Sequence, residues 1–241
     1  YKQDGDDPRF VYEHDFYLKQ QMWDTGEEAY VSVFRFHSPH DGIREFSIPN
    51  EKLEKRELLR QLAKNGVVST TNGGALHEYV INSITFKQNE RASEIMRLQF
   101  GWANKNTKFI VGEREITVDG VYHTPAAKVT RSIAQCFEPK GTFEKWQEVF
   151  NIYNRPGLEI QAFAALSGFG APLLRMTGQK GAIINLVHKN AGTGKTTVLR
   201  MANSICGDPE MLLGNPKDTQ VARVNKLGFL NNIVNTMDEL S

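Results

Sequence analysis

A glycine-bearing loop between an apolar run and a helical pattern holds the residues best suited to chemistry. The apolar run covers residues 183–188, the loop with its Gly-Lys-Thr covers 189–197, and the helical pattern follows from Val198. Gly192 and Gly194 allow backbone angles closed to other residues, so successive amide N–H groups can turn toward the phosphates of a nucleotide. An apolar strand, such a loop, Gly-Lys-Thr and a helix together predict a phosphate-binding loop.

The side chains of this loop predict a site for ATP and Mg²⁺. Lys195 would place a mobile positive charge on the β- and γ-phosphates, and the Thr196 hydroxyl would bind the Mg²⁺ ion that bridges them. In the full motif the first position is glycine, whereas Lys189 stands there in this chain, which leaves the entry geometry of the loop open. The predicted nucleotide-binding residues are Asn190, Ala191, Gly192, Thr193, Gly194, Lys195, Thr196 and Thr197.

A second element with chemical potential is an acidic pair at the end of another apolar run. Residues 232–237 predict a short strand that delivers Asp238 and Glu239 at its carboxyl end, where ligands bind in open α/β sheets. Asp238 would hold the metal or its water shell, and Glu239 would act as general base on the attacking water. The predicted catalytic residues are therefore Lys195 and Glu239, and the predicted metal ligands are Thr196 and Asp238.

Either element alone occurs by chance, but the two in this order predict nucleotide binding with hydrolysis. The sequence between them has room for a helix from Thr196 to about Cys206, a short strand near 211–213 and a helix near 218–226. Alternating strands and helices of this kind are typical of a three-layer α/β/α core.

The composition limits the kind of protein further. The 241 residues carry a net charge of +1, which gives no global signature of a nucleic-acid binder, although a local basic channel stays open. Cys136 and Cys206 lie far apart without partners at metal-ligand spacing, which favours reduced thiols in a cytosolic protein. No apolar run reaches membrane length and nothing resembles a signal peptide. We therefore expect a cytoplasmic protein without a membrane partner.

The first part of the chain, residues 1–138, predicts an α+β module. Alternation at 29–36, and more weakly at 43–48, predicts a β-hairpin around a five-residue turn. Asn50 is expected to cap the helix that follows. The further elements expected in this module are helices at 51–64 and 76–87 and strands at 95–100 and 108–116.

Residues 139–178 predict a helical linker or lid, and residues 179–241 a P-loop core. Thr142 can cap a helix at 143–153. A longer helix at 158–175 is apolar nearly all round, which favours buried support. The predicted fold class is α/β: an α+β module, a helical lead-in and the first part of a three-layer nucleotide-binding core. Because such a sheet normally continues past its acidic strand, we expect the core to be truncated after that strand.

Several segments, taken in order, resemble an ATPase family of phage, plasmid and prophage primase-helicases, often catalogued only as a domain of unknown function. The resemblance covers most of the chain from about Phe34. The segments that carry it are 46–49, 58–66, 100–102, 109–116, 141–146, 164–174, the phosphate loop, Cys206-Gly207-Asp208-Pro209 and Met237-Asp238-Glu239.

The resemblance implies a motor ATPase for the replication of mobile DNA, similar to superfamily 3 or other AAA+-like helicases. Such enzymes form rings, here expected to be hexamers, and act on single-stranded or forked DNA in a bacterial or phage-infected cell. An arginine from the neighbouring subunit usually completes each active site. In the terms of such families, the loop would be the Walker A motif, and Asp238 with Glu239 the Walker B motif.

Two other functions stay open. One is an AAA+-like NTPase that remodels proteins or acts as a switch, which a protein partner would stimulate in place of DNA. The other is an interaction module that binds nucleotide without turnover. A DNA contact through Trp102, Lys105, Lys108 and Phe109 is a further hypothesis, since aromatic and basic side chains bind single strands. A hairpin with a core tryptophan explains those residues equally well.

Overall fold

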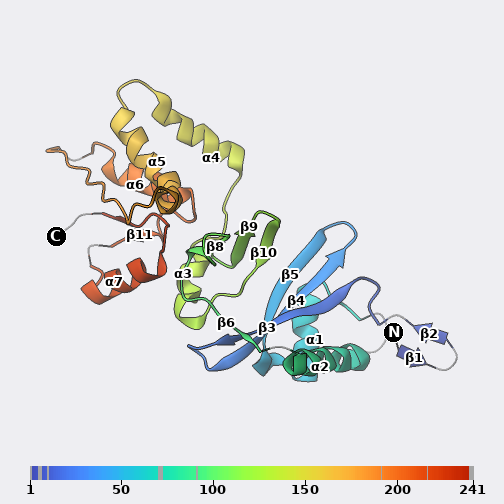
Figure 1. The fold of residues 1–241 in the computed structure, drawn as a ribbon. Helices are drawn as coiled ribbons and strands as arrows, with labels where there is room; N and C mark the ends of the chain where they lie inside the picture. The colour runs from blue at the N-terminus through green and yellow to red at the C-terminus, as the bar shows by residue number, and fades with distance from the viewer. Residues whose placement is uncertain are drawn as a thin grey trace. The chain divides into compact units, whose positions relative to one another are not determined.

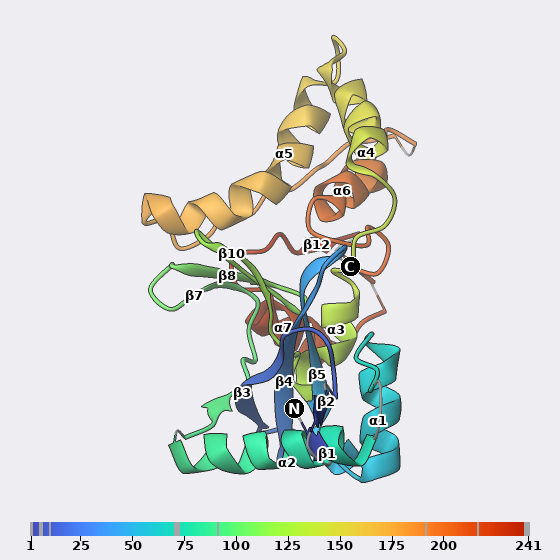
Figure 2. The same cartoon turned by 90° about the vertical axis from the view of Figure 1, so that its right-hand side faces the viewer.

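The computed structural model describes residues 2–4, 7–9, 11–69, 73–90, 92–190, 192–215 and 217–238. These residues form a mixed α/β structure with two compact units, shown in two views in Figures 1 and 2. Unit 1 comprises Tyr1–Arg97 and Tyr122–Val129, and unit 2 comprises Leu98–Val121 and Thr130–Ser241. The three-part division at residues 138 and 178 stays a prediction.

Unit 1 is built on a four-stranded sheet with the order β5-β4-β3-β6. Its strands are β3 (Phe16–Asp24), β4 (Ala29–Ser38), β5 (Gly42–Pro49) and β6 (Glu94–Ile95). β4 pairs antiparallel with β5, so the predicted hairpin is confirmed. β3 pairs antiparallel with β4 and, over two residues, parallel with β6. A short antiparallel pair, β1 (Lys2–Asp4) and β2 (Asp7–Arg9), precedes this sheet.

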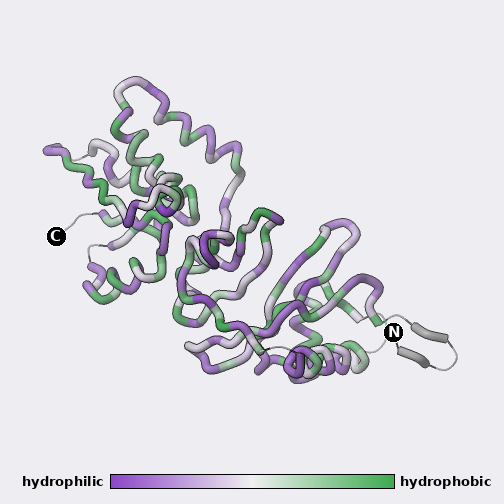
Figure 3. The backbone as a smooth tube through the Cα atoms, in the orientation of Figure 1, coloured by the Kyte–Doolittle hydropathy of each residue, from purple (hydrophilic) through white to green (hydrophobic). Residues whose placement is uncertain are grey.

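Two helices bury the apolar face of this sheet: α1 (Lys55–Lys64) and α2 (Gly73–Glu90). Alternate strand residues, among them Phe34 and Phe46, pack against helix residues such as Leu58 and Val80 in one core. Burial of these side chains is the main force holding the unit together. The hydropathy of each residue can be followed in Figure 3.

The start of α1 differs from the sequence prediction. Asn50 begins a 3₁₀ turn, η1 (Asn50–Lys52), and its side chain accepts a hydrogen bond from Ser32 at 2.7 Å. The carboxylate of Glu54 caps α1 instead, accepting from the backbone N–H groups of Arg56 and Glu57 at 3.1 and 3.2 Å. The prediction that Asn50 caps this helix is therefore wrong, because its side chain is hydrogen-bonded to Ser32 of the sheet.

A second four-stranded sheet has the order β10-β9-β8-β7; β7, β8 and β9 belong to unit 2, and the residues of β10 are divided between the two units. Its strands are β7 (Gly101–Ala103), β8 (Lys108–Val111), β9 (Arg114–Thr117) and β10 (Gly120–His123). The single strand expected at 108–116 is broken at Gly112, which has φ +60° and where a Cβ atom would lie 3.0 Å from Cβ of Phe137. The strand expected at 95–100 is also wrong, because β6 ends at Ile95 and β7 begins only at Gly101.

The helices of unit 2 include the two predicted in the linker. Thr142 caps α4 (Phe143–Phe150) as expected, accepting from the Lys145 amide at 3.4 Å. The longer helix is α5 (Glu159–Leu174). The remaining helical elements of unit 2 are α3 (Arg131–Gln135), η3 (Asn151–Asn154), η4 (Arg175–Thr177), α6 (Lys195–Ser204) and α7 (Gln220–Phe229). The turn η2 (Lys128–Thr130) begins in unit 1 and ends at the first residue of unit 2's second segment.

α5 is buried on one face only. Its small residues Ala164, Ala165 and Gly168 are buried, and at Gly168 a Cβ atom would lie 2.4 Å from the carbonyl oxygen of Ala202 in α6. Ile160 and Phe163, by contrast, are 73% and 65% exposed. The prediction of buried support therefore holds only for the face against α6. None of the described helices is both long and apolar enough to cross a membrane.

Candidate nucleotide site

The apolar run before the loop does not form the expected strand. Residues 179–188 have neither helical nor strand geometry, and Ile183 and Val187 are 96% and 82% exposed. A strand satisfies its backbone N–H and C=O groups through a neighbour. No described residue lies beside this run as a strand, so the prediction of a strand at 183–188 is wrong for this structure.

The loop itself has the backbone that its glycines were expected to allow. Gly192 has φ +74° and Gly194 has φ +80°, both in the left-handed region that favours glycine. A Cβ atom at either position would meet no described atom within 4 Å. Glycine is therefore favoured here by the positive φ angle and not by a lack of space for a side chain. Gly194 is the N-cap of α6, and no side chain of the described residues caps the helix. The first amide groups of α6 are therefore open to an anion.

The loop side chains lie close to their own backbone. The amide of Asn190 donates to His188 Nδ1 at 3.1 Å, and Lys195 Nζ donates to the carbonyl oxygen of Asn190 at 3.4 Å. Thr197 is exposed in the first turn of α6, whereas the buried Thr193 hydroxyl has no hydrogen-bond partner among the described residues. Ala191 lies outside the described residues.

The structure brings together the two predicted metal ligands. The Thr196 hydroxyl donates to the carboxylate of Asp238, whose two oxygens lie at 2.9 and 3.1 Å. Thr196 is in the first turn of α6, and Asp238 follows β12 (Thr236–Met237). β12 pairs in parallel with β11 (Leu213–Gly214). The two helices expected between the motifs form as α6 and α7, whereas the strand expected at 211–213 is only the two-residue β11. The predicted strand at 232–237 shrinks to its last two residues. Glu239 lies outside the described residues.

A buried asparagine of α6, Asn203, was not among the predicted site residues. Asn203 is fully buried, accepts a hydrogen bond from the Thr236 hydroxyl at 2.9 Å, and donates one to the carbonyl oxygen of Pro209 at 3.2 Å. Asn203 lies two helical turns after Thr196, on the same face of α6, but that spacing alone does not indicate its partner in β12.

The segment Cys206-Gly207-Asp208-Pro209 anchors the end of α6. The Asp208 amide donates to the carbonyl oxygen of Cys136 at 2.7 Å, and Gly207 packs so closely there that a Cβ atom would lie 2.2 Å from the same oxygen. Lys140 pairs with the Asp208 carboxylate at 2.6 Å. This bond and the amides of Met211 and Glu210 hold the pKa of Asp208 below its usual range. The contacts of this segment are structural.

The donor set fits a nucleotide with Mg²⁺. The hydroxyl and carboxylate oxygens of Thr196 and Asp238 are of the hard type that Mg²⁺ prefers. The open helix N-terminus and the Lys195 ammonium suit phosphate oxygens. Thr196 and Asp238 would hold the metal, and Lys195 with the loop amides would hold the phosphates.

The hypothesis of a DNA contact at Trp102 is not favoured by its surroundings. The indole N–H donates to the carbonyl oxygen of Pro172 in α5 at 2.9 Å, and Phe109 meets the indole edge-on with ring centroids 5.1 Å apart. The ring is half-buried. These contacts explain Trp102 as a packing residue between the β7–β8 hairpin and α5.

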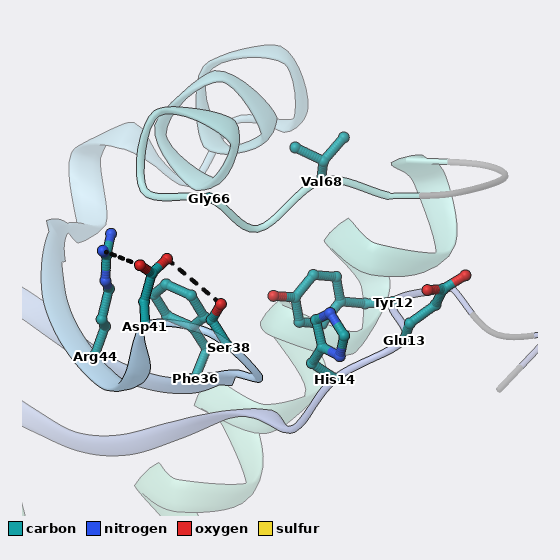
Figure 4. A pocket seen from close by; sticks show the side chains of 9 residues that line it. All are labelled: Tyr12, Glu13, His14, Phe36, Ser38, Asp41, Arg44, Gly66 and Val68. Atoms are coloured by element: carbon teal, nitrogen blue, oxygen red, sulfur yellow. Dashed lines mark hydrogen bonds and ion pairs between the residues drawn. The ribbon is translucent and has the colours of Figure 1, made fainter.

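A separate open hollow, drawn in Figure 4, belongs to unit 1 and contains none of the predicted site residues. Its volume is about 260 Å³, and Asp41 in its wall pairs with Arg44 at 3.2 Å. The rings of Tyr12 and His14 meet edge-on at 5.6 Å. These groups contact one another, so we assign no ligand to the hollow. It is lined by Tyr12, Glu13, His14, Phe36, Ser38, Asp41, Arg44, Gly66 and Val68.

Fold and site together define a mixed α/β protein with a candidate phosphate loop at the start of α6. Residues 1–241 match the model of the family described as "Domain of unknown function (DUF927)". The chain belongs to this family.

Comparisons with curated proteins and with solved structures give no further information on function. No relative among the curated proteins matches the chain. A solved structure described as "SCCmec type IV Cch - active helicase" is similar at 17% identity with a TM-score of 0.42. The match covers 88% of this chain and 41% of that one, so this chain spans less than half of that protein. A likeness of this size bears on neither activity nor partners.

Proposed function

We propose that unit 2 binds ATP with Mg²⁺ at residues 190–197 and that the protein hydrolyses it to drive movement on DNA. One observation carries the nucleotide part of the proposal: the Thr196 hydroxyl donates to the Asp238 carboxylate at 2.9 Å. These residues stand 42 positions apart, and the sequence predicts both as ligands of one Mg²⁺ ion.

The surroundings of this pair agree with a phosphate site. Thr196 stands one residue after Lys195, at the uncapped N-terminus of a ten-residue helix whose dipole favours anions. A hydroxyl and a carboxylate in hydrogen-bond contact beside such a terminus can bind Mg²⁺ while phosphates occupy the helix end.

The proposed roles follow from these positions. Mg²⁺-ATP supplies the phosphoryl bond that is broken and the charge that must be stabilised. Lys195 would neutralise phosphate charge, and Thr196 and Asp238 would hold the metal. The role of Glu239, to accept the proton of the attacking water, rests on the sequence motif alone. Catalysis here is mainly positioning and electrostatic stabilisation.

The motor part of the proposal rests on the resemblance of the motif order to primase-helicases. We infer a ring, expected as a hexamer, in which a neighbouring subunit supplies an arginine to each site. Single-stranded or forked DNA would be the track. An AAA+-like role on proteins is the outcome that a different stimulating partner would reveal.

Binding of a fluorescent ATP analogue to the whole chain tests the nucleotide part. The wild type should bind in Mg²⁺, and Lys195→Ala should abolish binding, because the phosphates lose their main counter-charge. Lys217→Ala, a change at an exposed lysine elsewhere in unit 2, should bind like the wild type. Binding that is equally strong in Lys195→Ala and the wild type would reject this site.

Hydrolysis in the full-length protein tests the motor part. We expect single-stranded DNA to stimulate ATP turnover and Glu239→Gln to abolish it while nucleotide binding persists. Turnover that responds to a protein partner and not to DNA would favour the remodelling function. Unchanged turnover in Glu239→Gln would reject Glu239 as the base.

A further inference from the structure

Two hydrogen bonds connect one face of α6 to β12 and the residue after it. Thr196 in the first turn of α6 contacts Asp238, and Asn203, two helical turns later, contacts Thr236. The helix and the strand run in opposite directions, so the earlier helix residue meets the later strand residue. The two contacts therefore determine the position of β12 along α6 and its distance from the helix.

The contact at Asn203 is the better protected of the two. Asn203 is 0% exposed and Thr236 is 5% exposed, whereas Thr196 and Asp238 are half-buried. A buried amide must have its hydrogen bonds satisfied, and the side chain of Asn203 meets this need with Thr236 on one side and Pro209 on the other. In water-excluded surroundings such bonds hold a single geometry.

Asn203 also joins the site to the segment that ends α6. Its Nδ2 donates to Pro209, whose neighbour Asp208 is held by Lys140 and by the backbone of Cys136. A continuous series of contacts thus runs from the α3 region through Asn203 and Thr236 to the strand that carries Asp238.

We propose that Asn203 and Thr236 are positioning residues that hold the Asp238 carboxylate at the Thr196 hydroxyl and so determine the affinity of the site for Mg²⁺. This inference rests on the proposed nucleotide function. Thr236 is two positions before Asp238, so a shift of β12 relative to α6 moves the carboxylate away from the hydroxyl. Nucleotide binding without metal depends on Lys195 and the loop, which this shift does not touch.

A matched pair of substitutions at Thr236 isolates the hydroxyl. Thr236→Val keeps the branched shape and removes the hydrogen bond, whereas Thr236→Ser keeps the hydroxyl. Binding of the fluorescent ATP analogue is measured for the whole chain with EDTA and with Mg²⁺. In EDTA, Thr236→Val should bind within about twofold of the wild type. Its gain in affinity from Mg²⁺ should fall roughly five- to tenfold, the effect of one neutral hydrogen bond, and Thr236→Ser should keep the gain.

A purely structural role gives a different result. If Thr236→Val retains the full gain from Mg²⁺, or weakens binding equally with and without Mg²⁺, the positioning role is wrong. If Thr236→Val does not fold, Thr236→Ala takes its place, because it cannot overpack the site, with the same comparison to Thr236→Ser.

Hydrogen exchange in the nucleotide-free protein separates this inference from the proposed function. The Asp238 amide donates to the Gly214 carbonyl at 3.4 Å, so its exchange reports on how firmly β12 is held. Thr236→Val should speed its exchange and Thr236→Ser should not; unchanged exchange in Thr236→Val overturns the inference. Absence of Mg²⁺-dependent nucleotide binding in the wild type overturns the proposed function, even where exchange shows that Thr236 holds the strand.

Discussion

Thr196 and Asp238 lie within hydrogen-bond distance, with the hydroxyl of one donating to the carboxylate of the other at 2.9 Å. Thr196 stands at the N-terminus of α6, and Asp238 follows a strand that pairs in parallel with β11. Their contact brings the loop and the end of the strand to one place. The first prediction tests the charge at this place.

Asp238→Asn should weaken Mg²⁺-dependent binding of the nucleotide by roughly tenfold or more, because the neutral amide keeps the shape but loses the charge that attracts the metal. Binding in EDTA should stay unchanged. A Mg²⁺ titration of fluorescent ATP binding measures both. Asp119→Asn, which neutralises an exposed aspartate elsewhere in unit 2, should match the wild type. An equal loss in both Asp variants would mean that the effect is one of overall charge.

The sequence predicts local features well because near neighbours determine them. Thr142 caps α4, the hairpin of β4 and β5 forms, and the helix expected from Thr196 forms from Lys195. In each case the necessary partners lie within a few residues. Gly192 and Gly194 likewise adopt the left-handed backbone that their place in the motif requires.

Features that depend on distant partners could not be predicted. Asn203 and Thr236 stand 33 positions apart, and nothing in either segment indicates their bond. The run at 183–188 has the composition of a strand, but a strand also needs a neighbour, and no described strand lies beside it. Asn50 has the chemistry of a cap, but Ser32 of the sheet takes its side chain.

The second prediction concerns the close approach of α5 and α6. Gly168→Ala should destabilise the protein by about 2–4 kcal/mol, because a Cβ atom there would lie 2.4 Å from a backbone carbonyl oxygen of α6. Gly170→Ala is a matched control in the same helix, where a Cβ atom meets nothing within 4 Å. It should raise stability by about 0.5–1 kcal/mol through helix propensity. Urea unfolding measures both, and equal stability of the two variants would contradict the packing of these helices.

The third prediction concerns Glu45, a buried carboxylate in the sheet of unit 1. It accepts hydrogen bonds from Lys19 at 3.0 Å, from the His123 amide at 2.7 Å and from Arg35 at 2.6 Å. Burial alone would raise the pKa of Glu45, but these donors outweigh burial and hold the pKa below its usual value.

Because the folded-state pKa of Glu45 is depressed, its contribution to stability is complete above the unfolded-state pKa and is lost as pH falls through the folded-state pKa. Glu45→Gln should therefore cost about 2–3 kcal/mol at pH 7 and progressively less in acid. Urea unfolding at a series of pH values measures the difference. Glu51→Gln, at an exposed position, should show little effect at any pH. A cost for Glu45→Gln that does not shrink in acid would contradict this account.

The fourth prediction concerns the two cysteines, which are free thiols in the structure. Burial raises the pKa of the Cys206 thiol to about 11, and burial also raises the pKa of Cys136. Since the thiolate is the reactive form, both should react slowly with a thiol reagent such as DTNB at pH 8 in the native protein. In denaturant both should react at the rate of a free cysteine. Cys206→Ser should remove one of the two slow reactions without creating a fast one. Rapid native labelling of Cys206 would show that the end of α6 opens readily, contrary to the anchoring by Asp208 and Lys140.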